Sequence, residues 1–198
     1  MTRILCLMLA LGLPLAASAQ VAPDNEPAGP ALTPPPVVRP TDARETLRRW
    51  FQGFEFVPEE AHFRRLGDGL APGLLALAND EAQPLTIRAR AVSSMIYADD
   101  AATGAWLVAR LSDPDAPSLL RRKAALAVGE RQGAAAIDLL ASALINASDD
   151  VPLREACARA LRGLGPVAYA ARDALLKSET APTVRGLLLD DKRIGMPR

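Results

Sequence analysis

The sequence is poor in the residues that most often carry chemistry. It contains one histidine, His62, and two cysteines, Cys6 and Cys157. A zinc site needs three or four suitable ligands, and these residues are too few and too far apart to supply them. Nucleophilic catalysis usually needs a histidine that is oriented by a third group, whereas His62 lies beside glutamates in a short predicted helix. We therefore predict no metal, no cofactor and no enzymatic activity.

Lysine is also scarce, so arginine supplies nearly all the positive charge, and the formal net charge of the chain is +0. This balance gives no support for a nucleic-acid partner, because such proteins normally present a basic face. After the first nineteen residues no segment has the ~20 apolar residues that a membrane span needs. No stretch alternates polar and apolar residues as a strand would. The sequence predicts an all-α protein without a membrane span.

Two segments precede the predicted folded part. Residues 1–19 contain Arg3, a short apolar stretch and the small residues ASA at 17–19, which is the pattern of a cleaved signal peptide. We expect export to the periplasm or the cell exterior. Residues 20–40 are rich in proline and lack apolar periodicity, which predicts a disordered linker.

A period of 33 residues organises the rest of the chain. Arginine recurs at this spacing, and an acidic or amide residue stands eight positions before each arginine; the pairs are Asp80 and Arg88, Asp113 and Arg121, and Asn146 and Arg154. Such a period is typical of stacked helical repeats. We predict an N-terminal helical cap over 41–79, about three to four repeats over 80–190 and a polar tail over 191–198.

Apolar positions repeat with the arginines. The first helices of the units have an i, i+4, i+7, i+8 stripe, which is one face of a helix; its members are Ile87, Ala91, Ser94 and Met95, then Leu120, Ala124, Ala127 and Val128, then Leu153, Cys157, Ala160 and Leu161. The second helices align Leu74, Leu107 and Leu140, and also Ala78, Leu111 and Leu144. We expect the turns between paired helices at 99–104, 132–133 and 163–166. After the third unit Asp173 stands where the period requires leucine, so the pattern is displaced there.

Two strings, LRRKAALAVG at 120–129 and LREACARAL at 153–161, resemble the first helix of a HEAT repeat. The resemblance is to the short bacterial repeats also found in phycobilisome lyases, and it covers about 80–180. It implies an armadillo-type, right-handed α-α superhelix. It also implies a ladder in which the acidic residue and the arginine of neighbouring units pair. Asn146 departs from this pattern because it lacks the charge.

Two groups of residues are candidates for partner contact. The family resemblance places second helices on the concave face, where an exposed aromatic beside arginine is typical of interfaces; the candidates there are Trp106, Arg110, Asp138 and Ser142. The second group is the aromatic cluster Trp50, Phe51, Phe54, Phe56 and Phe63. Trp106 either contacts a partner or packs on the neighbouring unit. The cluster either seals the N-terminal cap or anchors a partner through Trp50 and Phe51.

These features predict an exported protein-protein binding or scaffolding module with an unknown partner. The alternative is an accessory or chaperone-like subunit of an exported enzyme. An enzyme in its own right ranks third, since its best candidate is the carboxylate pair Asp99 and Asp100, and helix capping explains that pair equally well.

Overall fold

The computed structural model describes residues 40–53 and 56–189, which all belong to one compact unit, Pro36–Arg198. Every regular element in these ranges is helical and none is a strand, so the all-α prediction is confirmed. No helix in these ranges is long and apolar enough to cross a membrane. Several predicted features lie outside the described residues, namely the export segment 1–19, the linker up to residue 39, Phe54 and the tail 191–198.

The α-helices of the described ranges are α1 (Pro40–Gln52), α2 (Glu60–Arg64), α3 (Leu70–Asn79), α4 (Leu85–Ser94), α5 (Ala101–Ser112), α6 (Ser118–Gln132), α7 (Ile137–Asn146), α8 (Val151–Gly163), α9 (Tyr169–Leu176) and α10 (Pro182–Leu189). Short 3-10 helices are η1 (Gly67–Gly69), η2 (Met95–Tyr97), η3 (Gly133–Ala136) and η4 (Gly165–Ala168). α1 ends directly before Gly53, and α2 begins at Glu60 with Glu59 as its N-terminal cap.

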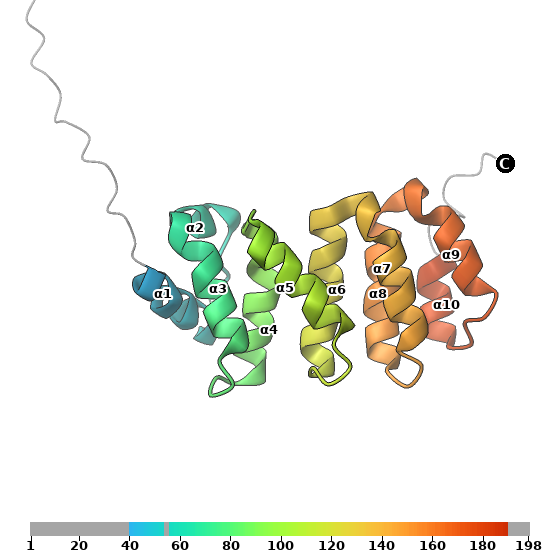
Figure 1. Ribbon diagram of the computed structural model, residues 1–198, viewed down its shortest axis with the longest axis horizontal. Coiled ribbons are helices and arrows are strands. Elements are labelled where there is room, and N and C mark those ends of the chain that lie inside the picture. Colours follow the sequence, from blue (N-terminus) through green and yellow to red (C-terminus); the bar gives the residue numbers. More distant parts are fainter. Residues whose placement is uncertain (1–39, 54–55, 190–198) are drawn as a thin grey trace, which may run out of the picture. The chain divides into compact units, whose positions relative to one another are not determined.

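The helices pack in consecutive pairs (Figure 1). α3 packs on α4, α5 on α6, α7 on α8 and α9 on α10, and the second members of these pairs also pack on one another in chain order. α1 packs on α3 and α4 at the N-terminal end. The sequence paired the helices differently, with turns at 99–104, 132–133 and 163–166. The closely packed pairs are instead joined by the links 80–84, 113–117, 147–150 and 177–181.

The predicted apolar stripes are confirmed. All twelve stripe positions are buried; eleven lie on α4, α6 and α8, and Met95 begins η2. The five leucines and one alanine assigned to α3, α5 and α7 are buried as well. Small side chains in the stripe let α6 and α8 approach closely. A Cβ added at Gly129 would lie 3.0 Å from the Cβ of Ala160, so the two backbones meet there without room for another methyl group.

The last pair is displaced from the period, as the sequence indicated. Asp173 is exposed on α9, and the fully buried position next to it is taken by Arg172, while Leu175 continues the core. The guanidinium Nε of Arg172 donates to the carbonyl oxygen of Leu188 at the end of α10, with an N–O distance of 2.9 Å. A hydrogen-bonded partner allows this charged side chain to lie in the core.

Candidate functional site

The repeated arginines bind the ends of helices. The Nε of Arg88 donates to the carbonyl of Ala78, at 3.0 Å, and the Nε of Arg121 donates to the carbonyl of Leu111, at 3.3 Å. Both carbonyls lie in the last turn of the preceding helix, where intrahelical donors run out. The two contacts are related by the 33-residue period. These arginines therefore satisfy buried main-chain groups and are not displayed for a ligand.

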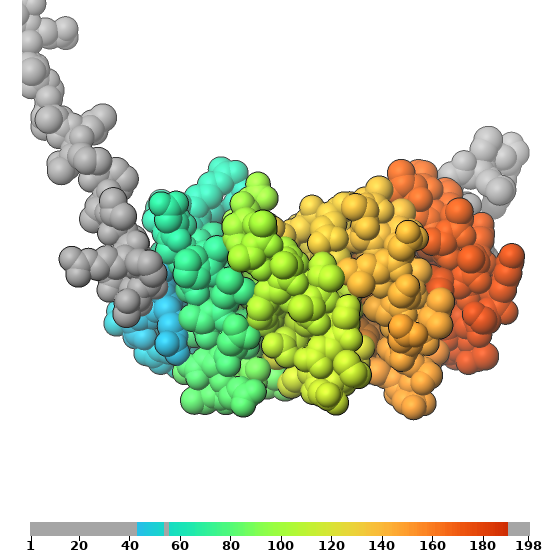
Figure 2. All heavy atoms as spheres, viewed as in Figure 1, coloured from blue at the N-terminus to red at the C-terminus, as the bar shows by residue number. Residues whose placement is uncertain are grey.

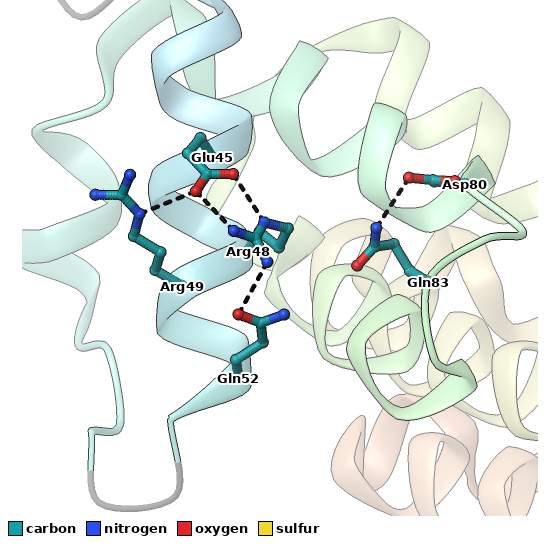
Figure 3. A network of polar contacts seen from close by, with 6 residues as sticks. All are labelled: Glu45, Arg48, Arg49, Gln52, Asp80 and Gln83. Carbon is teal, nitrogen blue, oxygen red and sulfur yellow. Dashed lines mark hydrogen bonds and ion pairs between the residues drawn. The ribbon is translucent and has the colours of Figure 1, made fainter.

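The acidic members of the predicted ladder have other partners. Asp80 pairs with Arg44 of α1, at 2.5 Å between Nη2 and Oδ2. It also accepts a hydrogen bond from Gln83 (Figure 3). Asp113, which directly follows α5, pairs with Arg110 in the last turn of that helix, at 3.3 Å between Oδ2 and Nη1. Among the described residues no ion pair joins either carboxylate to the arginine eight positions later.

The links explain this difference from the ladder that the resemblance implies. The Oδ1 of Asp80 accepts from the amide of Ala82, and that of Asp113 from the amide of Asp115, at 3.1 and 3.0 Å. Such contacts two residues along the chain stabilise tight turns. The carboxylates thus close the links after α3 and α5, while the arginines reach the carbonyls beside them. The hydrogen bond from Gln83, followed by the contacts with Ala82 and Arg44, lowers the pKa of Asp80.

The third arginine has a different partner. Arg154 pairs through Nη1 with Oε1 of Glu179, at 3.0 Å, and the two side chains are 14% and 2% exposed. Glu179 also accepts from the amide of Ala181, at 2.7 Å. Glu179 lies 33 residues after Asn146, so the acidic position of the period returns in the next unit. The predicted bridge between units is present here, whereas Asn146 itself is exposed.

Further arginines act at helix ends without belonging to the period. Arg131 of α6 donates to the carbonyls of Met95 and Asp100, at 2.9 and 3.1 Å, and to that of Ala98. Arg185 donates to the carbonyls of Leu176 and Glu179, both at 2.8 Å. A guanidinium offers five donors in a fixed fork, which an ammonium does not. This geometry favours arginine over lysine at these positions.

Trp106 packs on the neighbouring pair of helices. Its indole Nε1 donates to Oδ1 of Asn79 at the end of α3, at 3.0 Å. The guanidinium of Arg110 lies over its ring, 5.0 Å from the centroid, and also pairs with Asp113. Trp106 is partly buried against the core. These contacts support the structural interpretation of Trp106.

Asp138 and Ser142 lie one turn apart on α7, and both are exposed. α5 and α7 lie toward the viewer in Figure 2. Among the described residues no hydrogen bond or ion pair connects Asp138 or Ser142 with Trp106 or Arg110. The structure therefore keeps the four candidates on two helices without assembling them into one cluster.

The described members of the aromatic cluster at the N-terminal end lie together. The ring of Trp50 lies 5.9 Å from Phe56, 6.0 Å from His62 and 5.8 Å from Phe63, measured between centroids. Phe63 in turn stacks on Tyr97 of η2, at 4.6 Å. This contact joins α2 to η2 at the end of α4, and no pattern in the sequence indicated it.

The cluster surrounds an open cavity of about 370 Å³. Its walls come from the end of α1, the segment before α2, and the last turn of α4 with η2; the lining residues are Trp50, Phe51, Gly53, Phe56, Val57, Pro58, Phe63, Arg90, Ser93, Ser94, Ile96 and Tyr97. Phe51 is 3% exposed and belongs to the core, whereas Phe56 is 40% and Val57 79% exposed. The cluster thus both seals the core and presents apolar surface.

Arg90 holds the wall of this cavity. Its Nη1 donates to the carbonyls of Phe51 and Gly53, at 2.5 and 3.1 Å. These carbonyls lie at the end of α1, so Arg90 also caps a helix end. Its Nε and Nη2 have no hydrogen-bond partner among the described residues. Among the described lining residues Arg90 is the only charged one.

The other side chains that could take part in a reaction have structural contacts. The Nδ1 of His62 accepts from the amide of Glu59, at 3.1 Å, and so helps to cap α2. Asp100 caps α5 by accepting from the amide of Thr103, at 2.8 Å. Burial raises the pKa of the Cys157 thiol to about 12, so it stays protonated at neutral pH. Within the described ranges no group of three or more His, Cys, Asp or Glu residues is placed to hold a metal ion.

Comparisons with known protein families, with curated proteins and with solved structures find no match for this chain.

Proposed function

We propose that the chain is an exported binding module that holds an apolar segment of another protein in the cavity beside Trp50. The supporting observation is the exposure of Phe56 and Val57 on the rim of a cavity whose inner walls are aromatic. Apolar pockets with a few convergent polar groups are the usual form of a binding site. Aromatic side chains that fill or line such pockets carry much of the binding energy at interfaces.

The proposal includes a HEAT-type, right-handed α-α superhelix as the scaffold. Two observations support it: the stripes of α4, α6 and α8 are buried at a 33-residue spacing, and these helices pack on one another in chain order. Stacked repeats of this kind present extended binding surfaces. The arginine contacts at helix ends hold the stack in place, so the cavity is largely formed before a partner arrives. Pre-formed sites bind with a smaller entropic cost.

Selection of displayed peptides against the immobilised full chain tests this proposal. We expect enrichment of sequences with large apolar residues. The selected peptides should bind Val57→Asp at least ~10-fold more weakly, because a carboxylate at the rim opposes the entry of an apolar group.

The matched control is Ile145→Asp, on α7, where the native side chain is 62% exposed. It makes the same change of an exposed aliphatic residue to a carboxylate, and it should leave binding unchanged. Failure to enrich any peptide would contradict the proposal. Loss of binding in Ile145→Asp, with Val57→Asp unaffected, would move the site to the face of α5 and α7.

A further inference from the structure

Arg90 gives the apolar cavity a specific charge requirement. The described residues that line the cavity include one cation and no carboxylate. An apolar partner that covered Arg90 would take its remaining donors out of water without an acceptor, which is unfavourable. The complementary ligand therefore has an apolar body and one anionic group.

The free donors of Arg90 have the geometry that a carboxylate requires. The two main-chain contacts use Nη1 alone. Nε and Nη2 lie on the opposite edge of the planar guanidinium, where their N–H groups are parallel and can bind both oxygens of one carboxylate. Because Nη1 is already bonded to Phe51 and Gly53, the guanidinium is oriented before the ligand binds, which lowers the ordering cost.

Two serines beside Arg90 add polar groups to the same side of the cavity. Ser93 and Ser94 follow Arg90 by three and four positions on α4, so all three lie on one face of the helix, and all three line the cavity. Their hydroxyls can donate to a carboxylate oxygen or bind a nearby peptide group. The end of α4 carries a partial negative charge, which opposes an anion there. Recognition of a carboxylate must therefore depend on Arg90.

The size of the cavity limits the apolar body. A volume of about 370 Å³ lies at the small end of the ~300–1,000 Å³ range of ligand pockets. One large side chain with its own carboxylate fits this range, and the exposed Phe56 and Val57 offer apolar surface to the preceding chain. Both groups are present on one residue only at the last position of a chain, where a large apolar residue carries the terminal carboxylate.

We propose that the cavity binds the carboxyl terminus of a partner chain, with a large apolar last residue among the rings of Trp50 and Phe63 and its carboxylate on Nε and Nη2 of Arg90. This inference rests on the proposed binding function, and it names the part of the partner that is bound. It places recognition on the α4 side of the cavity, which the family resemblance did not indicate.

Calorimetric titration of the full chain with three matched peptides tests the inference. The probes are an acetylated hexapeptide ending in phenylalanine as the free acid, the same peptide as the C-terminal amide, and a peptide amide with the phenylalanine at an internal position. We expect the acid to bind roughly 10-fold or more tightly than either amide, as for a hydrogen-bonded ion pair. Emission of Trp50, recorded in a Trp106→Phe background, should shift only when a peptide enters the cavity.

Arg90→Gln is the decisive variant, and Arg122→Gln on α6 is its control with the same loss of charge. In Arg90→Gln the acid should bind no better than the amide, whereas Arg122→Gln should keep the full ratio. Because Arg90 also supports the wall of the cavity, its substitution could change the shape of the cavity. The comparison of acid and amide peptides on the unchanged protein tests the inference without any variant.

The other outcomes are separable. Equal binding of acid and amide on the unchanged protein, with a shift of Trp50 emission, would overturn the inference and leave the proposed binding function intact. Absence of binding by all three peptides would overturn both. Binding of 3-phenylpropionate as tightly as the acid peptide would overturn the chain terminus as the occupant, since a small carboxylic acid would then suffice.

Discussion

At the centre of the described chain, α6 and α8 meet through small side chains, whereas at the N-terminal end α1, α2 and η2 meet through large rings. Gly129 and Ala160 bring the two central backbones as close as their atoms allow. The rings of Trp50 and Phe63 contact each other edge to face, with centroids 5.8 Å apart, and line an open cavity beside them. Small side chains let two helices pack without a gap. Large rings span a wider separation between helices and leave space beside them. The interface of α6 and α8 thus stabilises the stack, whereas the aromatic cavity at the N-terminal end has space for a partner.

The largest expected effect comes from the ring that joins the aromatic end to the core. Phe63 is 1% exposed and stacks on Tyr97. Phe63→Ala should lower the free energy of unfolding by about 4 kcal/mol, the range of buried Phe→Ala changes. Chemical denaturation measures it. Phe63→Leu, which retains most of the volume, should cost much less. Equal losses for the two variants would show that the ring is not packed as described.

The next effect concerns the buried ion pair at the opposite end. Glu179→Gln leaves the guanidinium of Arg154 buried without a countercharge, and should cost about 3 kcal/mol in unfolding free energy. Because the penalty comes from the unpaired charge, the double variant Arg154→Leu with Glu179→Leu should recover part of the loss. A single variant as stable as the unchanged protein would contradict this account of the pair.

A smaller effect tests the close approach of α6 and α8 directly. Gly129→Ala adds a methyl group 3.0 Å from the Cβ of Ala160, and should destabilise the protein by about 1–2 kcal/mol through overpacking. Gly163→Ala, at the end of α8, meets nothing within 4 Å and should stabilise by about 0.5 kcal/mol through helix propensity. Thermal melts of both variants give the comparison. Stabilisation by both would mean that the central helices have more room than the structure shows.

The smallest effect is the pH dependence at α1. Hydrogen bonds from Arg48 first, and then Arg49, lower the pKa of Glu45 from 4.5 to about 2 (Figure 3). A carboxyl with a lowered pKa in the folded state adds stability that is fully present above pH 4.5. This stability is lost as the pH falls toward 2. The melting temperature of Glu45→Gln should therefore decline less than that of the unchanged protein over this range. A parallel decline would remove Glu45 from the acid response.

The sequence predicted the core because burial there follows a period. Ile87, Leu120 and Leu153 can be assigned from spacing alone, since a stacked helix must bury the same face each time. The acidic position continues to Glu179, but the displacement at Asp173 obscured this continuation. Arg154, the partner of Glu179, was correctly predicted to bridge neighbouring units.

The remaining arginine contacts and the cavity had no comparable signal. Arg90 and Arg131 bind main-chain carbonyls. Every residue has the same main-chain carbonyl whatever its side chain, so the identity of the acceptor cannot be predicted from the sequence. The aromatic cluster was recognised from composition. Its cavity was not, because Trp50 and Tyr97 come to line the same space only when α1 packs on α4.

Hydrogen exchange measured by mass spectrometry on the full chain, with and without a selected peptide, tests most directly whether the aromatic cavity is the binding site. We expect slower exchange in fragments that cover 50–63 and 90–97, with no change across α7 (Ile137–Asn146). Protection confined to α5 and α7, around Trp106 and Asp138, would contradict the account and place binding on the other candidate face.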